Sequence, residues 1–272
     1  MAAFRPEIWI NAFVSYFGEL PSLLDAISRY DEFVGTGTFG DTIKVPGLTL
    51  PAAIDIVPGA VGAGALQAPV DVTVGIVLDK MKGHPIPVTP QDERFNHPDY
   101  INAIMRDAGR TVKDASNTSV LALAADAAVT QEVNADGSAL GDADLLEVKR
   151  LMDEARCPEL GRIMALTPKG ANDLASISTF TNSQFGAGQN QNQLQMCRGM
   201  EVKQFPTTFF AAAGGNSKCL AFHPMMIGGA VARPWLELQG QAGEFRKILE
   251  IAAIYGLKIR KATGLVRILR AT

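Results

Sequence analysis

The stretch from His97 to Ala128, HPDYINAIMRDAGRTVKDASNTSVLALAADAA, organises the rest of the chain. Its apolar residues recur at steps of three and four, which places them on one face of a helix. Pro98 and Asp99 suit a first helical turn, because proline lacks the N–H that is unpaired there and a carboxylate is favoured at the positive helix end. The pattern predicts a helix of about 30 residues, roughly 45 Å long, that could support a sheet along its side. The apolar stripe consists of Ile101, Ile104, Met105, Ala108, Val112, Ala115, Val120, Leu123 and Ala127.

The composition predicts a folded chain with a substantial core. Of its 272 residues 47% are hydrophobic, too many for a disordered protein. The formal net charge of −3 argues against a protein whose main role is to grip nucleic-acid backbones. No apolar run approaches the roughly 20 residues of a membrane span, and no signal peptide is recognisable. Three widely spaced cysteines without a CxxC pair favour a reducing compartment, so we expect a cytoplasmic product without a membrane partner.

The N-terminal segment is rich in aromatic residues. Phe4–Trp9 (FRPEIW) begins a predicted helix that Gly18 ends, and a second short helix is predicted over Pro21–Tyr30. The segment either packs on the core of its own chain or forms an arm that docks on a neighbouring subunit, because aromatic side chains anchor interfaces well. The candidate contact residues in the arm are Trp9, Phe13 and Phe17.

A long hairpin is predicted between residues 35 and 88. Two strand-like segments, Thr42–Val45 and Val72–Leu78, flank a stretch rich in glycine, proline and alanine, and a turn is predicted at Lys82-Gly83 before an extended piece over 84–88. An isolated apolar hairpin is marginally stable alone, so we expect it to dock on a neighbouring subunit. The candidate contact residues here are Phe39, Ile76 and Leu78.

The second half of the chain alternates helices and strands. The acidic segment 134–144 suggests calcium at first sight, but its glycine and its last ligand position do not follow the EF-hand spacing, so we interpret it as a turn and a helix cap. Helices are predicted over Leu145–Ala155 and from Pro168 to Ile177, a polar loop over 181–198, and a helix or turn over 224–232. Strands are predicted at Gly161–Leu166, Glu201–Phe205, Cys219–Phe222, Trp235–Leu238, Leu257–Ile259 and Leu265–Leu269.

Residues that usually carry catalysis do not stand in a suitable pattern. His84, His97 and His223 lie in three unrelated settings, without a neighbouring carboxylate or nucleophile. The glycines over 59–64 lack the lysine of a P-loop and the order of a dinucleotide fingerprint. We therefore expect no catalytic residues, no cofactor and no metal, and hence no enzyme. The basic residues of the last strands could touch DNA but are interpreted as a solvated sheet face; they are Lys258, Arg260, Lys261, Arg267 and Arg270.

Three segments and the order of the parts carry a family resemblance. The segments are Phe4–Trp9, Gly40–Val45 (GDTIKV) and Leu160–Leu174, in which a strand, a Thr-Pro step and a helix follow one another. An aromatic arm, a long hairpin, a long helix, an α/β region and a strand-rich return that includes Tyr255–Ile259 (YGLKI) complete the order. This arrangement resembles the major capsid proteins of tailed bacteriophages, which have the Hong Kong 97-type capsid fold, and among them the podovirus coat proteins.

The resemblance implies an α+β shell protein. Its segments would be an N-terminal arm over 1–34, an extended loop (E-loop) over 35–92, a peripheral domain with the spine helix over 93–136 and 230–272, and an axial domain over 137–229. It would assemble with itself into pentamers and hexamers of an icosahedral shell, in contact with portal and scaffolding or decoration proteins. The shell would enclose double-stranded DNA without sequence-specific binding, and the protein would reside in the virion capsid after assembly in the host cytoplasm.

Two alternatives stay open at this point. An encapsulin-like nanocompartment would share the fold but enclose a cargo enzyme in place of a genome. An α/β enzyme that acts on a small molecule is the alternative from another class, and a monomer without any tendency to assemble would favour it.

Overall fold

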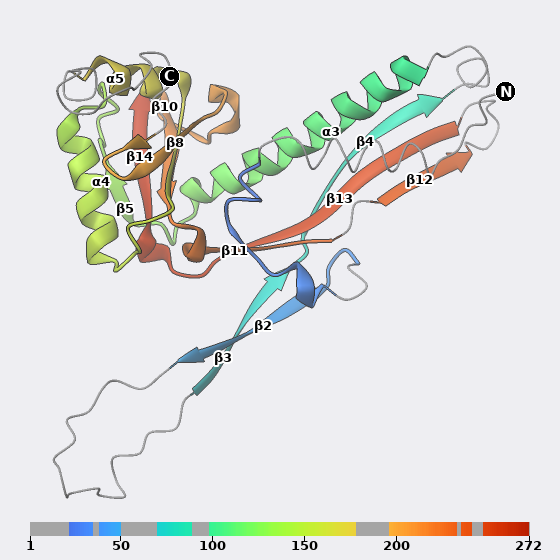
Figure 1. The fold of residues 1–272 in the computed structure, drawn as a ribbon, viewed down its shortest axis with the longest axis horizontal. Helices are drawn as coiled ribbons and strands as arrows, with labels where there is room; N and C mark the ends of the chain where they lie inside the picture. Colours follow the sequence, from blue (N-terminus) through green and yellow to red (C-terminus); the bar gives the residue numbers. More distant parts are fainter. Residues whose placement is uncertain are drawn as a thin grey trace, which may run out of the picture.

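The computed structural model describes residues 22–34, 38–49, 70–88, 98–177, 196–232, 235–240 and 247–271. These residues form an α+β fold, as predicted, with a five-stranded sheet, a seven-stranded sheet and a separate two-stranded hairpin. Figure 1 shows the seven-stranded sheet at one end of the long helix α3, the five-stranded sheet alongside this helix, and the hairpin directed away from both sheets.

Helix α3 covers Pro98–Leu121, and its position confirms the helix predicted from the apolar stripe. Met105, Ala108, Val112 and Val120 are buried along one face. The helix ends at Leu121, earlier than predicted, and continues as the 3₁₀ turn η2 (Ala122–Ala125). The chain leaves this turn because Asp126 is extended and its carboxylate accepts a hydrogen bond from the Ala128 N–H (2.9 Å).

The five-stranded sheet lies along α3. Its central strand β13 (Lys247–Ile259) pairs antiparallel with β4 (Lys80–Val88) and, in turn, with β12 (Trp235–Gly240) and β11 (Ile227–Val231). The short strand β1 (Ser28–Arg29) adds to β11 in parallel. Figure 1 shows β4 and β13 running beside α3.

The seven-stranded sheet holds the larger core. Its order is β5 (Gln131–Val133), β14 (Leu265–Ala271), β10 (Asn216–Phe222), β6 (Arg162–Leu166), β8 (Met200–Gln204) and β7 (Met196–Cys197), and β9 (Ala212–Ala213) pairs with β10. Every residue of β6 is buried, as expected of a central strand. Helices α4 (Asp142–Glu154) and α5 (Pro168–Ser176) lie beside this sheet in Figure 1. The short 3₁₀ turns are η1 (Asp31–Phe33), η4 (Thr207–Phe209), η5 (Pro224–Met226) and η6 (Ala262–Gly264).

Most predicted elements of the second half are confirmed, and local side chains explain their ends. The Thr167 hydroxyl caps α5 by accepting a hydrogen bond from the Gly170 N–H (3.2 Å). The Asp144 carboxylate accepts a hydrogen bond from the Gly141 N–H (2.8 Å) at the start of α4, in agreement with the predicted helix cap. Asn134 adopts a left-handed conformation (φ 58°), and its amide donates to the carbonyls of Ser138 and Leu269, as expected of a turn.

Three predicted elements are wrong. Pro21–Tyr30 is not a helix in its described part, where residues 23–27 form turns and bends. Two contacts hold this segment in another conformation: the Leu23 N–H donates to the Asn117 side chain of α3, and β1 pairs with β11. The segment 224–232 contains strand β11, which its glycines concealed. The predicted turn at Lys82-Gly83 lies inside β4, and the break falls at Leu78-Asp79 instead.

The sheets also divide the chain differently from the predicted segments. Strand β4 falls in the predicted extended loop but pairs with β13. Strand β14 falls in the predicted peripheral segment but pairs with β10 in the seven-stranded sheet.

Candidate functional site

The hairpin of β2 (Thr42–Thr49) and β3 (Val70–Val77) is anchored at its root by an apolar cluster. Ile43 and Val45 of β2 pack there with Ile76, Leu78 and two alanines, Ala230 of β11 and Ala232 directly after this strand. The Leu78 backbone closes the root, because its N–H donates to the Asp41 carbonyl and its carbonyl accepts from the Gly40 N–H, both at 2.9 Å. The base of the hairpin is therefore part of the folded subunit.

The structure separates the candidate contact residues of the hairpin. Ile76 and Leu78 are fully buried in the root cluster, so their side chains are not exposed to a neighbouring subunit, and we correct their assignment. Alternation along β3 places them on the covered face. Phe39, in contrast, is 59% exposed. Trp9, Phe13 and Phe17 lie outside the described residues.

Further exposed apolar side chains surround the root. Phe33 of η1, Val77 of β3 and Met81 of β4 are each 43–44% exposed, although all three are large and apolar. These three residues and Phe39 lie on segments that meet near the hairpin root, and we call the four exposed residues the root patch. The sequence did not single out Phe33, Val77 and Met81, because no local pattern records which apolar side chains the distant segments of the fold leave uncovered.

The described part of the N-terminal segment packs on its own chain. The Asn117 amide oxygen of α3 accepts a hydrogen bond from the Leu23 N–H (2.8 Å). Lys113, four residues earlier on the helix, pairs with Asp25 (3.5 Å). The Asp31 carboxylate accepts from the Val231 N–H (2.8 Å). Of the two interpretations of the arm, packing on the subunit's own core therefore holds for residues 22–34.

The Lys113 side chain is 4% exposed although it carries an ammonium group. Burial lowers the pKa of Lys113, while the Asp25 carboxylate opposes the effect. This pair fixes the start of the described chain to the middle of α3.

His223 and the three buried cysteines have structural surroundings. The His223 ring bonds to the Leu160 carbonyl through Nε2 (3.0 Å) and accepts from the Met225 N–H through Nδ1 (3.2 Å). Burial raises the pKa of the Cys197 thiol to about 12 and of the Cys219 thiol to about 11, so neither is a thiolate at neutral pH. Within the described ranges, no group of three or more His, Cys, Asp or Glu residues could hold a metal ion.

The basic residues of β14 are not a solvated face, and this interpretation is wrong. Arg270 is buried and pairs with Asp173 of α5. The Arg267 guanidinium donates to the carbonyls of Asp126 and Val129, both at 3.1 Å. Both side chains make contacts inside the subunit. Lys258 of β13 is exposed, and so are the two basic residues of the loop that follows β13, Arg260 and Lys261.

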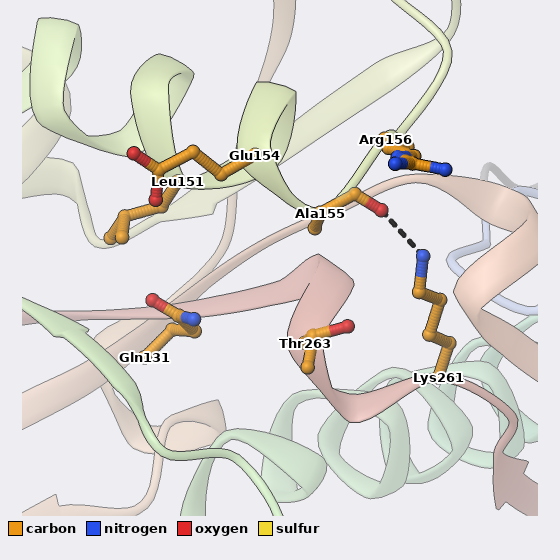
Figure 2. A pocket seen from close by; sticks show the side chains of 7 residues that line it. All are labelled: Gln131, Leu151, Glu154, Ala155, Arg156, Lys261 and Thr263. Carbon is orange, nitrogen blue, oxygen red and sulfur yellow. Dashed lines mark hydrogen bonds between the residues drawn. The ribbon is translucent and has the colours of Figure 1, made fainter.

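An open hollow of about 420 Å³ lies where α4 ends, next to η6 (Figure 2). Figure 2 shows the Lys261 ammonium donating to the Ala155 carbonyl across it. Its lining combines one carboxylate, Glu154, with two cationic side chains, Arg156 and Lys261, and the Lys261 ammonium is bonded to a backbone carbonyl. The lining residues are Gln131, Leu151, Glu154, Ala155, Arg156, Lys261 and Thr263.

In the described part of the chain, α3 and the other helices are too polar or too short to cross a lipid bilayer.

No protein-family model and no curated protein matches this sequence. Solved structures do match its fold. A structure described as Mycobacterium phage Che8 is 19% identical with a TM-score of 0.67, and the match covers 91% of each chain. The capsid structure of the cyanophage P-SCSP1u is 18% identical with a TM-score of 0.67, over 94% of this chain and 91% of that one. A virus-like particle from Pyrococcus furiosus is 11% identical with a TM-score of 0.59, over 96% and 98%. The chain therefore has the Hong Kong 97-type capsid fold.

Proposed function

We propose that this chain is a major capsid protein that assembles into the pentamers and hexamers of an icosahedral shell. The observation that carries the proposal is the hairpin of β2 and β3: its root is built into the subunit, whereas the rest extends away from the body (Figure 1). A two-stranded hairpin alone is marginally stable in water, so a second copy of the chain is its natural support. The likeness over 91% or more of this chain to phage capsid structures agrees with such a role.

The contacts between copies would use the hairpin, the root patch and the arm. A hairpin of one subunit that lies on the next subunit makes a heterologous contact, and rings of such contacts close by rotation into pentamers and hexamers. Phe39 is the candidate anchor of the root patch, because it is the most exposed aromatic residue described there. We place the arm contacts in residues 1–21, with Trp9, Phe13 and Phe17, since residues 22–34 pack on their own subunit.

The remaining partners follow from the same proposal. The shell would enclose double-stranded DNA through its overall shape and charge, without sequence-specific contacts. Portal and scaffolding or decoration proteins would bind the assembled shell, and assembly would take place in the host cytoplasm. The protein would act as a structural component without catalysis.

A second candidate is the shell of a protein nanocompartment. The virus-like particle from Pyrococcus furiosus, whose match covers 98% of that chain, agrees with a shell-forming role in general and does not favour the nanocompartment over the viral shell. The phage structures have higher TM-scores, 0.67 against 0.59, and we therefore keep the viral shell as the first candidate.

The test is negative-stain electron microscopy of the full chain, expressed alone and with its genomic neighbours, together with size-exclusion chromatography. Closed shells or five- and six-fold capsomers are expected. Double-stranded DNA inside native particles supports the viral role, and a single cargo protein supports the nanocompartment. A monodisperse monomer under every condition would overturn both.

A further inference from the structure

The hairpin root crosses the five-stranded sheet over a glycine. A Cβ atom built on Gly256 of β13 would lie 2.1 Å from the Val77 carbonyl oxygen and 2.8 Å from its carbon. Real Cβ atoms do not approach backbone atoms so closely, and a backbone carbonyl cannot rotate away as the end of a side chain can. The Gly256 position therefore admits the end of β3 only because it has no side chain.

The crossing lies on the sheet face opposite to α3. Tyr255 faces α3, because its hydroxyl lies 2.8 Å from the Ser119 hydroxyl, and the next residue of a strand points to the other face. Gly228 and Ala230 of β11 share that other face, since Ala230 is the register partner of Gly256. The Ile76 side chain reaches both glycines. These small residues form the floor on which the hairpin root rests.

The chain then enters the same sheet within three residues. After Val77 at the crossing, Leu78 and Asp79 form the break, and Lys80 is already paired with Tyr255, next to Gly256. The root is thus held at two points, above Gly256 and at the sheet edge beside it. Two fixed points so close together determine the direction in which the hairpin leaves.

We propose that Gly256 sets the angle between the hairpin and the body of the subunit, and thereby the curvature with which copies associate. The first half concerns the single subunit. The second half rests on the proposed function, because only an assembling protein converts the hairpin angle into shell geometry.

The size of the effect follows from the geometry. Replacing Gly256 by alanine requires the Val77 carbonyl to move by about 1 Å, to reach an ordinary contact distance. If β3 turns about Lys80 as a rigid strand at roughly 3.3 Å per residue, Thr73, seven residues from the pivot, moves by about 2 Å when Val77, three residues from it, moves by about 1 Å. The alanine at Gly256 therefore acts as a wedge that redirects the hairpin.

The test measures a distance inside one subunit. Thr73 and Arg110 of α3 are both exposed and are replaced by cysteines for spin labels, whereas the three native cysteines are buried. Labelled full-length chain is diluted with unlabelled chain, so that only pairs within a subunit are recorded. We expect one narrow distance in the parent protein, a shift of about 2 Å with Gly256→Ala, and shells that are lost or altered in diameter.

The matched control is Gly228→Ala in the neighbouring strand. A Cβ there meets only side-chain atoms, Arg260 Cδ and Ile76 Cδ1 at 3.3 Å and Tyr30 Cε2 at 3.4 Å, and these can move. The Gly228→Ala variant should leave the Thr73–Arg110 distance and the shells unchanged. A narrow, unshifted distance in Gly256→Ala, or an equal shift in Gly228→Ala, would overturn the proposal.

If the Gly256→Ala chain does not fold, the distance distribution measured in the parent protein tests the proposal. A broad distribution of the Thr73–Arg110 distance would show that the root does not fix the hairpin and would overturn the proposal, whereas a narrow one would support it. If Gly256→Ala shifts the hairpin but the parent protein never assembles, the result supports the role of Gly256 in the hairpin angle and contradicts the proposed shell function. The two halves can therefore fail separately.

Discussion

Asp173 of α5 binds the guanidinium of Arg270 in β14, with 3.1 Å between its Oδ1 and Nη2 of the arginine. The arginine side chain is 9% exposed and the aspartate 16%, so the pair is largely withdrawn from water. Arg270 also donates to the Gly137 carbonyl (3.1 Å), and Asp173 accepts from the Leu140 N–H (3.3 Å). One ion pair thus connects α5, the last strand and the turn before α4.

We predict that Asp173→Ala destabilises the fold by about 3 kcal/mol, because it leaves the Arg270 charge buried without its carboxylate. Urea unfolding followed by circular dichroism measures the loss. Glu147→Ala is the control, since the exposed pair of Glu147 and Arg150 on α4 should contribute nothing measurable. Equal midpoints for the Asp173→Ala and Glu147→Ala chains would contradict this account.

We predict that Tyr255→Phe lowers stability by about 1 kcal/mol, the usual net value of one hydrogen bond. The phenol of Tyr255 connects β13 to α3 through Ser119, 2.8 Å away, while Ser119 keeps its own bond to the Ala115 carbonyl (3.0 Å). Thermal unfolding of Tyr255→Phe, Ser119→Ala and the double variant provides the measurement. Because both single changes remove the same contact, the double variant should lose far less than their sum. Additive losses would show that the two hydroxyls act independently.

We predict that Asn117→Ala releases the start of the described chain from α3. The Leu23 N–H, now bonded to the Asn117 amide oxygen, would be left buried without this acceptor, at a cost of about 2 kcal/mol. Hydrogen exchange at Leu23 should accelerate, with little change in the buried strand β6. Arg110→Ala, at an exposed position of the same helix, is the control. Unchanged exchange at Leu23 would mean that other contacts hold this segment.

The sequence predicts the long elements well and the small ones poorly, for a physical reason. The period of α3 is visible because 24 residues present one apolar face to a neighbouring sheet. Strand β11 contains two glycines against which side chains from distant segments of the chain pack. No local sequence pattern records such a contact. For the same reason the pattern assigned Ile76 and Leu78 to an interface, whereas Ala230 and Ala232, more than 150 positions away, complete a cluster that buries them.

We predict that Lys113→Met increases stability at neutral pH, because it removes a buried charge and keeps a side chain of similar length. Burial lowers the pKa of Lys113 from its usual 10.5 and outweighs the opposing effect of Asp25. Between the lowered pKa and 10.5 the unfolded chain therefore holds more protons, and the stability of the parent protein rises with pH over that window. The advantage of the methionine should be full below the window and shrink as pH approaches 10.5.

Thermal unfolding at several pH values tests the sign. Asp25→Asn is the matched variant, because it removes the partner and keeps the buried ammonium, and it should lower stability at neutral pH. A lower unfolding temperature for Lys113→Met at pH 7 would instead show that the ion pair stabilises the fold.

We predict that Phe39→Asp impairs assembly while the subunit keeps its stability, whereas Ile76→Ala lowers the stability of the subunit itself. Phe39 is 59% exposed, so a charge there costs the fold little but would disrupt an apolar contact with a second copy. Ile76 is fully buried in the root cluster, and its truncation should cost about 2–5 kcal/mol. Unfolding curves and sedimentation velocity separate the two effects. Shells that form normally from the Phe39→Asp chain would remove the root patch from the assembly contacts, because a buried carboxylate without a partner would not be tolerated there.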